Sequence, residues 1–415
     1  MSRRVVITGM GTVNPLGHNT YESFNNMLDG ENGISEITLF DPHRLKVKMA
    51  GEVKNLNLED YFDHKEIKRN DRVMLLGLIA AKEAFEQANL NQGDFDPYRF
   101  GTFVTSGIGG LSTFYEEMKT AILNDPNRVS PFFVPKTIIN MTSGAISIKY
   151  GLKGPNLPIV TACSASTNSI GEAYRNIKHG YIDFAISGGS EASVTEIGIS
   201  AFQALRALST STDKDRASIP FDLERNGFVM AEGAGVIILE EYEMAKKRGA
   251  KILGELVGYG ATSDAFHVTA PDENAAAITK AITLALEEAG LSREEIDYIN
   301  AHGTSTQLND KIETIGIKNA FLDHAKKISI SSTKSMTGHA LGAAGAIESI
   351  VCLKVLESDT IPPTINYRVK DENCDLDYTV NQKKHRKVKY AMNINLGFGG
   401  HNAVLIFKKG DELND

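Results

Sequence analysis

The sequence predicts an α/β protein built from two similar halves. Short apolar runs alternate along the chain with longer stretches of helical periodicity, as in an α/β fold with mainly parallel strands. One unit occurs twice, around Cys163 and around His339: an apolar strand, a polar turn and a helix of small residues. With 415 residues the chain is long for a single core, so we expect two domains or one duplicated domain.

Composition excludes several classes of protein. A net charge of −8 argues against a nucleic-acid binder. No apolar run approaches the length of a membrane span, and the first residues lack the continuous apolar segment of a signal peptide. The cysteines, Cys163, Cys352 and Cys374, have the spacing of neither a disulfide framework nor a metal site. We therefore expect no metal centre and a reducing cytoplasm.

The first half is predicted to span residues 1–250. Its strands are expected at residues 4–9, 100–105, 157–160, 184–189 and 236–240, and its helices at 21–28, 73–88, 138–148, 170–179 and 242–248. The first strand is expected to end in a glycine turn at Gly9-Met10-Gly11. This turn resembles a dinucleotide-binding loop, but the next glycine, Gly17, comes six residues after Gly11, so the fingerprint is incomplete.

The second half is predicted to span residues 251–415, because a helix ends at Gly249 and a new strand follows. Its strands are expected at residues 253–257, 296–300, 328–332, 390–395 and 403–407, and its helices at 274–289 and from 339 through 353. Glycines between the last two strands predict a tight turn with free backbone N–H groups.

Cys163 lies where the 157–160 strand turns into a helix. Free N–H groups and the positive end of the helix dipole favour a thiolate there and could hold an oxyanion. The alternative is a small buried apolar residue, which describes most free cysteines.

Two histidines also follow predicted strands. His302 stands in AHGTST and His339 in TKSMTGH, with Lys334 five residues before His339. Because function collects at the carboxyl ends of parallel strands, we expect these side chains to meet Cys163 in one site.

A basic run, His64 to Arg72, stands out in an acidic protein. It is either a solvated helix face or a docking surface for an acidic partner.

Four motifs together carry a resemblance to a known family. TACSAS, NAHGTST, SSTKSMTGH and NLGFGGHN, in this order, resemble the β-ketoacyl-[acyl-carrier-protein] synthases, and the likeness runs from Val5 to beyond Val404. It is greatest for the synthase II type. The resemblance implies the thiolase-like fold, with two duplicated α/β halves in an αβαβα layering, and a homodimer. The implied reaction is a decarboxylative condensation that extends an acyl chain by two carbons, using malonyl- and acyl-carrier protein. It needs no cofactor, since phosphopantetheine arrives on the carrier protein. A synthase I-type or polyketide-type ketosynthase is the alternative.

The resemblance also assigns residues. Cys163 corresponds to the acyl-accepting nucleophile, His302 and His339 to the pair that contacts the malonyl thioester, and Lys334 to the lysine that organises one of these histidines. Phe398 corresponds to a gate residue, whose N–H would complete an oxyanion hole with that of Cys163. The remaining implied positions are substrate-binding residues near the phosphopantetheine arm or acyl chain (Thr269, Thr304, Thr306, Ile108 and Phe202) and carrier-docking residues (Lys65, Lys68 and Arg69).

Gln307 departs from the family pattern, which usually has proline after HGTST; we expect a looser turn there and a less certain position for Thr306. Related chemistries fit less well. A thiolase would have a second cysteine in the 397–401 turn, and a starter enzyme would use Asn where His339 stands. A chain-length partner would lack Cys163, and a Rossmann oxidoreductase remains an outside alternative.

Overall fold

A computed structural model describes residues 3–91 and 93–410. Within this part of the chain, the main sheet comprises nine strands, which are β1 (Val5–Val13), β4 (Phe100–Thr105), β5 (Phe184–Glu191), β6 (Gly233–Glu241), β7 (Gly254–Ser263), β8 (Tyr298–Asn300), β9 (Ser329–Ser331), β12 (Tyr390–Gly397) and β13 (His401–Lys409). Two small ribbons pair β2 (Ile34–Glu36) with β3 (Met49–Gly51) and β10 (Thr360–Ile361) with β11 (Lys384–His385).

The helices lie between these strands in the chain. They are α1 (Thr20–Leu28), α2 (His64–Arg69), α3 (Arg72–Ala88), α4 (Leu111–Lys119), α5 (Phe133–Thr137), α6 (Met141–Tyr150), α7 (Ala165–Lys178), α8 (Glu196–Ala204), α9 (Tyr242–Lys247), α10 (Ala276–Ala289), α11 (Gln307–Phe321), α12 (Lys334–Thr337) and α13 (Ala344–Ser358).

The strand order shows the predicted duplication directly. In the first half, β4 runs parallel to β5, β5 antiparallel to β6, and β6 antiparallel to β1. In the second half, β8, β12, β13 and β7 repeat the same sequence of directions. The two sets of strands join where β1 pairs with β7. The boundary predicted at residue 250 lies in the α9–β7 connection and stays a prediction.

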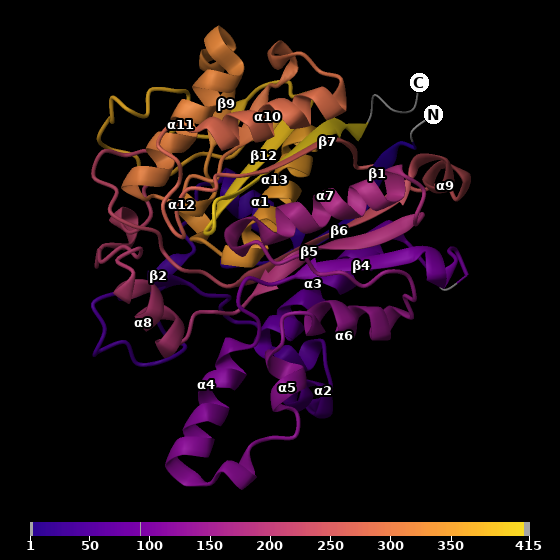
Figure 1. The fold of residues 1–415 in the computed structure, drawn as a ribbon, viewed down its shortest axis with the longest axis vertical. Coiled ribbons are helices and arrows are strands. Elements are labelled where there is room, and N and C mark those ends of the chain that lie inside the picture. Colours follow the sequence, from indigo (N-terminus) through magenta and orange to yellow (C-terminus); the bar gives the residue numbers. More distant parts are fainter. Residues whose placement is uncertain (1–2, 92, 411–415) are drawn as a thin grey trace.

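Helices cover both sets of strands and separate them (Figure 1). Helix α3 packs on β1 and β6, and α10 packs on β7 and β13, as outer layers. Helices α7 and α13 contact each other between the two sets of strands. Small residues along both helices let them lie buried between the layers, and most positions of α7 and α13 are buried. The result is the αβαβα layering.

Three expectations about strands were wrong. The sheet is mixed rather than mainly parallel, because β12 and β13 form a hairpin with no helix between them. The first strand continues through Gly9-Met10-Gly11 to Val13. These glycines serve close packing under α3, since a Cβ on Gly11 would lie 2.1 Å from the carbonyl oxygen of Ala80. Finally, the 157–160 segment is not a buried strand, since Leu157 is 54% exposed.

The repeated unit around Cys163 also needs a correction. Cys163 lies in a short 3₁₀ turn, Ala162–Ser164, directly before α7, and the matching turn before α13 is Leu341–Ala343. Both turns begin with a residue of positive φ, 52° at Ala162 and 43° at Leu341. The counterpart of Cys163 is therefore Gly342, and His339 stands three residues earlier. No helix among the described residues is long and apolar enough to cross a membrane.

Candidate active site

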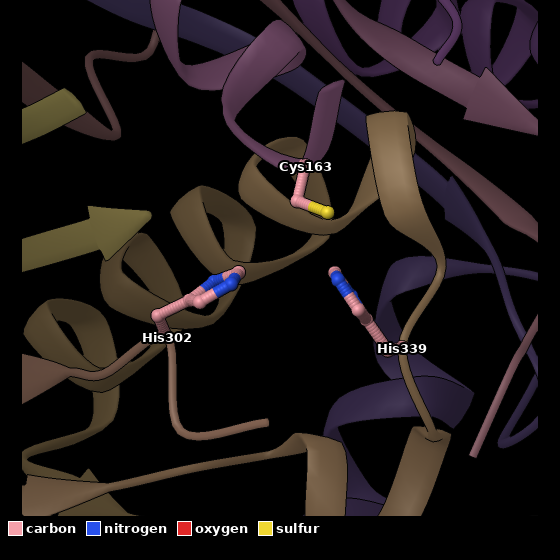
Figure 2. A group of neighbouring side chains, drawn as sticks. All are labelled: Cys163, His302 and His339. Atoms are coloured by element: carbon pink, nitrogen blue, oxygen red, sulfur yellow. The ribbon is translucent and has the colours of Figure 1, made fainter. Parts of the chain in front are cut away.

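Cys163, His302 and His339 meet at the junction of the two halves (Figure 2). The sulfur of Cys163 and one ring nitrogen from each histidine all lie within 4.8 Å of one another. The imidazole rings stand nearly perpendicular, with centroids 5.3 Å apart. One small molecule could therefore contact all three side chains. Such a group could also hold a metal ion, so the expectation of no metal centre stays a prediction.

The environment of Cys163 differs from the expected one in its electrostatics. Burial raises the pKa of the Cys163 thiol to about 12, and the nearby charge of Lys334 and the backbone N–H groups only partly oppose it. The prediction that the turn favours a thiolate was wrong, because the thiol is only 9% exposed and desolvation outweighs the helix terminus. The Cys163 thiol is therefore neutral near pH 7.

This pKa gives a testable pH dependence. Below its pKa, the thiolate fraction of a thiol rises about tenfold per pH unit. Alkylation of Cys163 by iodoacetamide should therefore keep rising from about pH 7 to about pH 10 without a plateau. Mass spectrometry of the peptide that carries Cys163 measures the rate. A plateau near neutral pH would contradict the raised pKa.

The backbone at His302 is held in place by a buried carboxyl group. The carboxylate of Glu313, in α11, accepts hydrogen bonds from the N–H groups of His302 (2.6 Å) and Gly303 (2.8 Å). Gly303 has a positive φ of 37°, so the chain turns sharply after His302. Burial raises the pKa of Glu313 to about 8. This carboxyl group fixes the loop that carries the imidazole.

His339 is fixed by a different contact. The backbone N–H of His339 donates to the carbonyl oxygen of Val229 (2.7 Å). Its backbone carbonyl accepts from the backbone N–H of Ala231 (2.9 Å). The segment from Phe228 to Gly233 thus holds the backbone of His339 in place. The ring packs edge-on against Phe228, and its two nitrogens have no hydrogen-bond partner among the described residues. Since His339 also lines the cavity, its ring can make a polar contact with a bound molecule.

Lys334 lies behind the histidines and is paired with a carboxylate. Its ammonium group donates to Glu348 of α13, and both side chains are buried. Burial lowers the pKa of His302 and of His339 well below the usual value, and the positive charge of Lys334 lowers both further. The two imidazoles are therefore neutral near pH 7, and each carries one N–H and one lone pair.

Phe398 lies in the hairpin between β12 and β13. Its backbone N–H and that of Cys163 both lower the pKa of the thiol, so both face the sulfur. The turn holds two residues of positive φ, Gly399 (87°) and Gly400 (78°), and is tied to its neighbours by the bond from Gly399 N–H to the Val268 carbonyl (2.7 Å). Paired donors of this kind stabilise an oxyanion that forms at a carbonyl attached to Cys163.

A cavity of about 340 Å³ opens from these groups to the surface. Among the predicted site residues, those that line it are Cys163, Phe202, Thr269, His302, Thr304, Thr306, His339 and Phe398. Ile108 lies outside this lining, but it packs with Phe202 on the same apolar cluster as Cys163. Lys334 does not line the cavity, and its charge affects the two histidines that do.

The turn at Gln307 is ordered. Thr306 stands at the N-cap position of α11, without a capping hydrogen bond from its side chain, and Gln307 is the first residue of the helix. The buried guanidinium of Arg225 donates to the carbonyl oxygens of both residues, at 3.0 and 2.8 Å. The hydroxyls of Thr304 and Thr306 lie 3.1 Å apart. Arg225 thus supplies the restraint that proline would otherwise give, and the expected loosening is not seen.

Several lining residues were missed from the sequence. They include Arg206, Asn226, Phe228, Asp264, Leu308 and Asn402. Phe228 directly precedes the residues that hold the backbone of His339, Val229 and Ala231. Arg206 gave no signal, since it is one arginine in an irregular segment.

The predicted docking residues lie elsewhere. Lys65, Lys68 and Arg69 are exposed on the short helix α2, and none lines the cavity. The guanidinium of Arg69 lies over the ring of Phe132, 5.5 Å from its centroid, next to α5. The basic run is therefore a surface feature outside the cavity.

Comparison with models of known protein families identifies the family of this chain. The N-terminal domain model of the β-ketoacyl synthase family matches residues 2–245, and the C-terminal domain model matches residues 253–368. The chain belongs to the β-ketoacyl synthase family.

Curated members of this β-ketoacyl synthase family match nearly end to end. A Staphylococcus aureus protein named 3-oxoacyl-[acyl-carrier-protein] synthase 2 is 47% identical over 98% of this chain and 99% of its own length. A protein of the same name from Synechocystis sp. is 44% identical and covers 98% of both chains.

Solved ketosynthases share the fold. A type II polyketide ketosynthase, solved in complex with its acyl-carrier protein, is 35% identical with a TM-score of 0.92, over 98% of this chain and all of that one. A β-ketoacyl synthase from Burkholderia phymatum is 31% identical with a TM-score of 0.89, over 98% and 99% of the two chains. These matches confirm the predicted fold class and family.

Proposed function

We propose that the protein is a 3-oxoacyl-[acyl-carrier-protein] synthase of the second type, which extends fatty acyl chains by two carbons. The observation that carries the proposal is the meeting of one thiol and two neutral imidazoles beside paired backbone N–H groups in one open cavity. The names of curated relatives at 44% and 47% identity support it.

The first half-reaction acylates Cys163. The thiol attacks the thioester of acyl-carrier protein, a new C–S bond forms, and the carrier leaves as a free thiol. Since the Cys163 thiol is neutral at rest, a neighbouring lone pair must take its proton. His339 offers one, because both its nitrogens lack partners among the described residues.

The second half-reaction forms the carbon–carbon bond. Malonyl-carrier protein enters, its carboxylate leaves as CO₂, and the bonding electron pair passes into an enolate. N–H donors of His302 and His339 hold the enolate oxygen. The enolate carbon then attacks the acyl carbonyl, and the N–H groups of Cys163 and Phe398 hold the resulting oxyanion. Collapse of this intermediate breaks the C–S bond, and a proton restores the thiol. No metal or redox cofactor takes part.

The test supplies purified acyl-carrier and malonyl-carrier protein and follows the products by mass spectrometry. We expect one 3-oxoacyl chain, two carbons longer, and one CO₂ per acyl chain consumed. A polyketide-type enzyme is the second candidate, because a solved neighbour at 35% identity is named as one. Repeated extension of one chain without reduction would favour that type, and no extension at all would refute both.

Carrier protein is the proposed macromolecular partner, and α2 its docking surface. Acidic carrier would meet Lys65, Lys68 and Arg69, which are exposed in an otherwise acidic protein. A solved neighbour at 35% identity forms a complex with its own acyl-carrier protein. We also place the enzyme in the cytoplasm, where a reducing milieu keeps Cys163 free.

Charge reversal tests this docking surface. The double variant Lys65→Glu/Lys68→Glu should raise the apparent KM for carrier-bound substrates by about tenfold or more with little change in kcat. The matched control reverses two exposed lysines of the second half, Lys326 and Lys327. Equal KM values in wild type and the α2 variant would mean that the run is a solvated helix face.

We further propose a homodimer. Exposed apolar side chains gather on α4, α6 and the neighbouring chain segments, and they are Phe114, Met118, Ile122, Leu123, Val134, Ile138, Ile148, Leu157 and Val160. The 157–160 segment follows Asn156, which bridges to Thr102 of β4, so it lies beyond the edge of the sheet. An exposed apolar edge of this kind is a self-association surface.

Sedimentation measures this assembly. Ile148 is 81% exposed, so Ile148→Asp should cost little folding stability yet dissociate the dimer. Tyr181→Asp, at another exposed apolar side chain, is the control and should remain dimeric. A wild-type monomer at micromolar concentration would exclude the proposal.

A further inference from the structure

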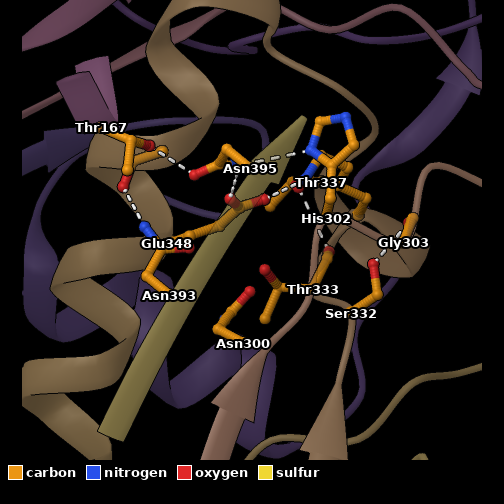
Figure 3. Close-up of polar contacts among 12 residues, drawn as sticks. Thr167, Asn300, His302, Gly303, Ser332, Thr333, Thr337, Glu348, Asn393 and Asn395 are labelled. Carbon is orange, nitrogen blue, oxygen red and sulfur yellow. Dashed lines mark hydrogen bonds and ion pairs between the residues drawn. The ribbon is translucent and has the colours of Figure 1, made fainter. Parts of the chain in front are cut away.

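Asn395, on β12, connects the buried ion pair to His302 (Figure 3). Its Nδ2 donates to Oε2 of Glu348 at 2.7 Å and lies 3.3 Å from Nδ1 of His302. Its Oδ1 faces the hydroxyl of Thr167 on α7. Asn395 itself has no exposed surface. A continuous chain of contacts thus runs from Lys334 through Glu348 and Asn395 to His302.

The Glu348 carboxylate determines which way the amide points. The ammonium of Lys334 can only donate, and it occupies the other oxygen of Glu348. Turning the amide over would place Oδ1 against Glu348, which requires a proton on that carboxyl group. Burial raises the pKa of Glu348. The carboxylate form follows from the direct contact with the Lys334 ammonium, which pairs with an ionised oxygen of Glu348 in the same buried site. The NH₂ group of Asn395 therefore faces both Glu348 and His302.

We propose that Asn395 is a positioning residue that holds His302 in one tautomer, with the proton on Nε2. Because the NH₂ group donates to Nδ1, that nitrogen must present its lone pair, and the neutral ring carries its proton on the other side. His302 then offers a fixed N–H donor to the cavity. His339 has no such restraint among the described residues, so it can donate or accept. His302 therefore serves as a hydrogen-bond donor, whereas His339 can serve as a donor or as an acceptor.

This tautomer also affects metal binding. The sulfur and ring nitrogens of the site lie within 4.8 Å of one another, close enough for a Zn²⁺ ion after small side-chain rotations. A metal needs a lone pair on the nitrogen that faces it. With the proton on Nε2 of His302, one of the three ligands is withheld. Asn395 thus favours an oxyanion over a cation in the same cavity.

Nitrogen NMR of ¹⁵N-histidine-labelled enzyme reads the tautomer directly. We expect the His302 signals of wild type to show protonated Nε2 and unprotonated Nδ1 near pH 7. In Asn395→Asp, the new carboxyl group would share one proton with Glu348, and the oxygen that faces His302 would accept from Nδ1–H, so the imidazole proton should move to Nδ1. Asn395→Leu, which is similar in size but has no polar atom, should lose the preference. The control is Asn393→Leu: Asn393 lies on the same strand and donates to Gly345 and Ser349 without touching His302, so the His302 signals should not change.

Protonated Nδ1 in wild type, or identical His302 signals in wild type and both Asn395 variants, would overturn the proposal. The wild-type spectrum alone decides it if the variants do not fold.

Two further measurements test how the His302 tautomer affects decarboxylation and zinc binding. Asn395→Asp should slow malonyl decarboxylation about 10- to 100-fold, the usual effect of losing a residue that orients a functional histidine. Zn²⁺ should protect Cys163 of this variant from iodoacetamide at a concentration about tenfold lower than in wild type. Equal protection would contradict the proposed role of the tautomer.

The decarboxylation result rests on the proposed function, and the NMR and zinc results do not. A tautomer that switches without changing decarboxylation would refute the function assigned to His302 and leave the positioning role intact.

Discussion

Replacing Cys163 by alanine should abolish chain extension, with a loss of about 10³-fold or more, since removing a covalent nucleophile has effects of this size or larger. No other thiol can take its place, because Cys352 and Cys374 are buried and neither lines the cavity. Malonyl decarboxylation should persist, because His302 and His339 remain. Radiolabelled acyl-carrier protein measures extension, and release of labelled CO₂ measures decarboxylation.

Cys374→Ala is the matched control for this experiment. Cys374 is a free, buried cysteine in the second half, and its replacement should leave extension within about twofold of wild type once the variant is shown to fold. Extension at the normal rate by Cys163→Ala would refute the assignment of the nucleophile.

Replacing either histidine should slow malonyl decarboxylation more than acylation of Cys163, the reverse of the effect of Cys163→Ala. His302→Ala and His339→Ala each remove a donor to the enolate oxygen, which should slow decarboxylation about 10²- to 10³-fold. Cys163 should still acquire an acyl label in His302→Ala. If His339 takes the thiol proton, His339→Ala should also acylate more slowly. Decarboxylation assays and intact-protein mass spectrometry measure the two steps.

Two controls accompany the histidine variants: replacement of a histidine outside the site, and the pH dependence of decarboxylation by the wild type. His324→Ala removes an imidazole that contacts the Ile296 carbonyl and the ring of Phe321 and does not line the cavity, so both steps should be unchanged. Because burial and Lys334 lower the pKa of His302 and His339, the neutral form should persist, and wild-type decarboxylation should not fall as pH drops through about 6.5. Normal decarboxylation in both alanine variants would overturn their role.

The sequence predicted the fold class and the chemical groups of the site because both leave local signatures. Apolar runs mark most of the strands, and Cys163, His302 and His339 stand in stretches of small and polar residues. The resemblance added Phe398 and the threonines, and all of these residues line the cavity. Spacing alone could not have shown that the three groups meet, since they come from both halves.

Features that depend on packing were not predictable in this way. Gly9 and Gly11 look like a turn in the sequence, yet they lie within β1 because α3 packs directly on them. The pKa of Cys163 follows from its burial, which overrides the helix terminus visible in the sequence. The role of Asn395 depends on Thr167, Glu348 and His302, which lie far apart in the chain and meet only after folding.

The most direct test of the central claim is a two-stage single turnover followed by mass spectrometry. Wild-type enzyme is first given acyl-carrier protein alone, and we predict one acyl group on the peptide that contains Cys163. Malonyl-carrier protein is then added, and that label should disappear as a 3-oxoacyl chain two carbons longer appears on the carrier. An acyl group found on another residue, or a product formed while the Cys163 label stays in place, would contradict the account.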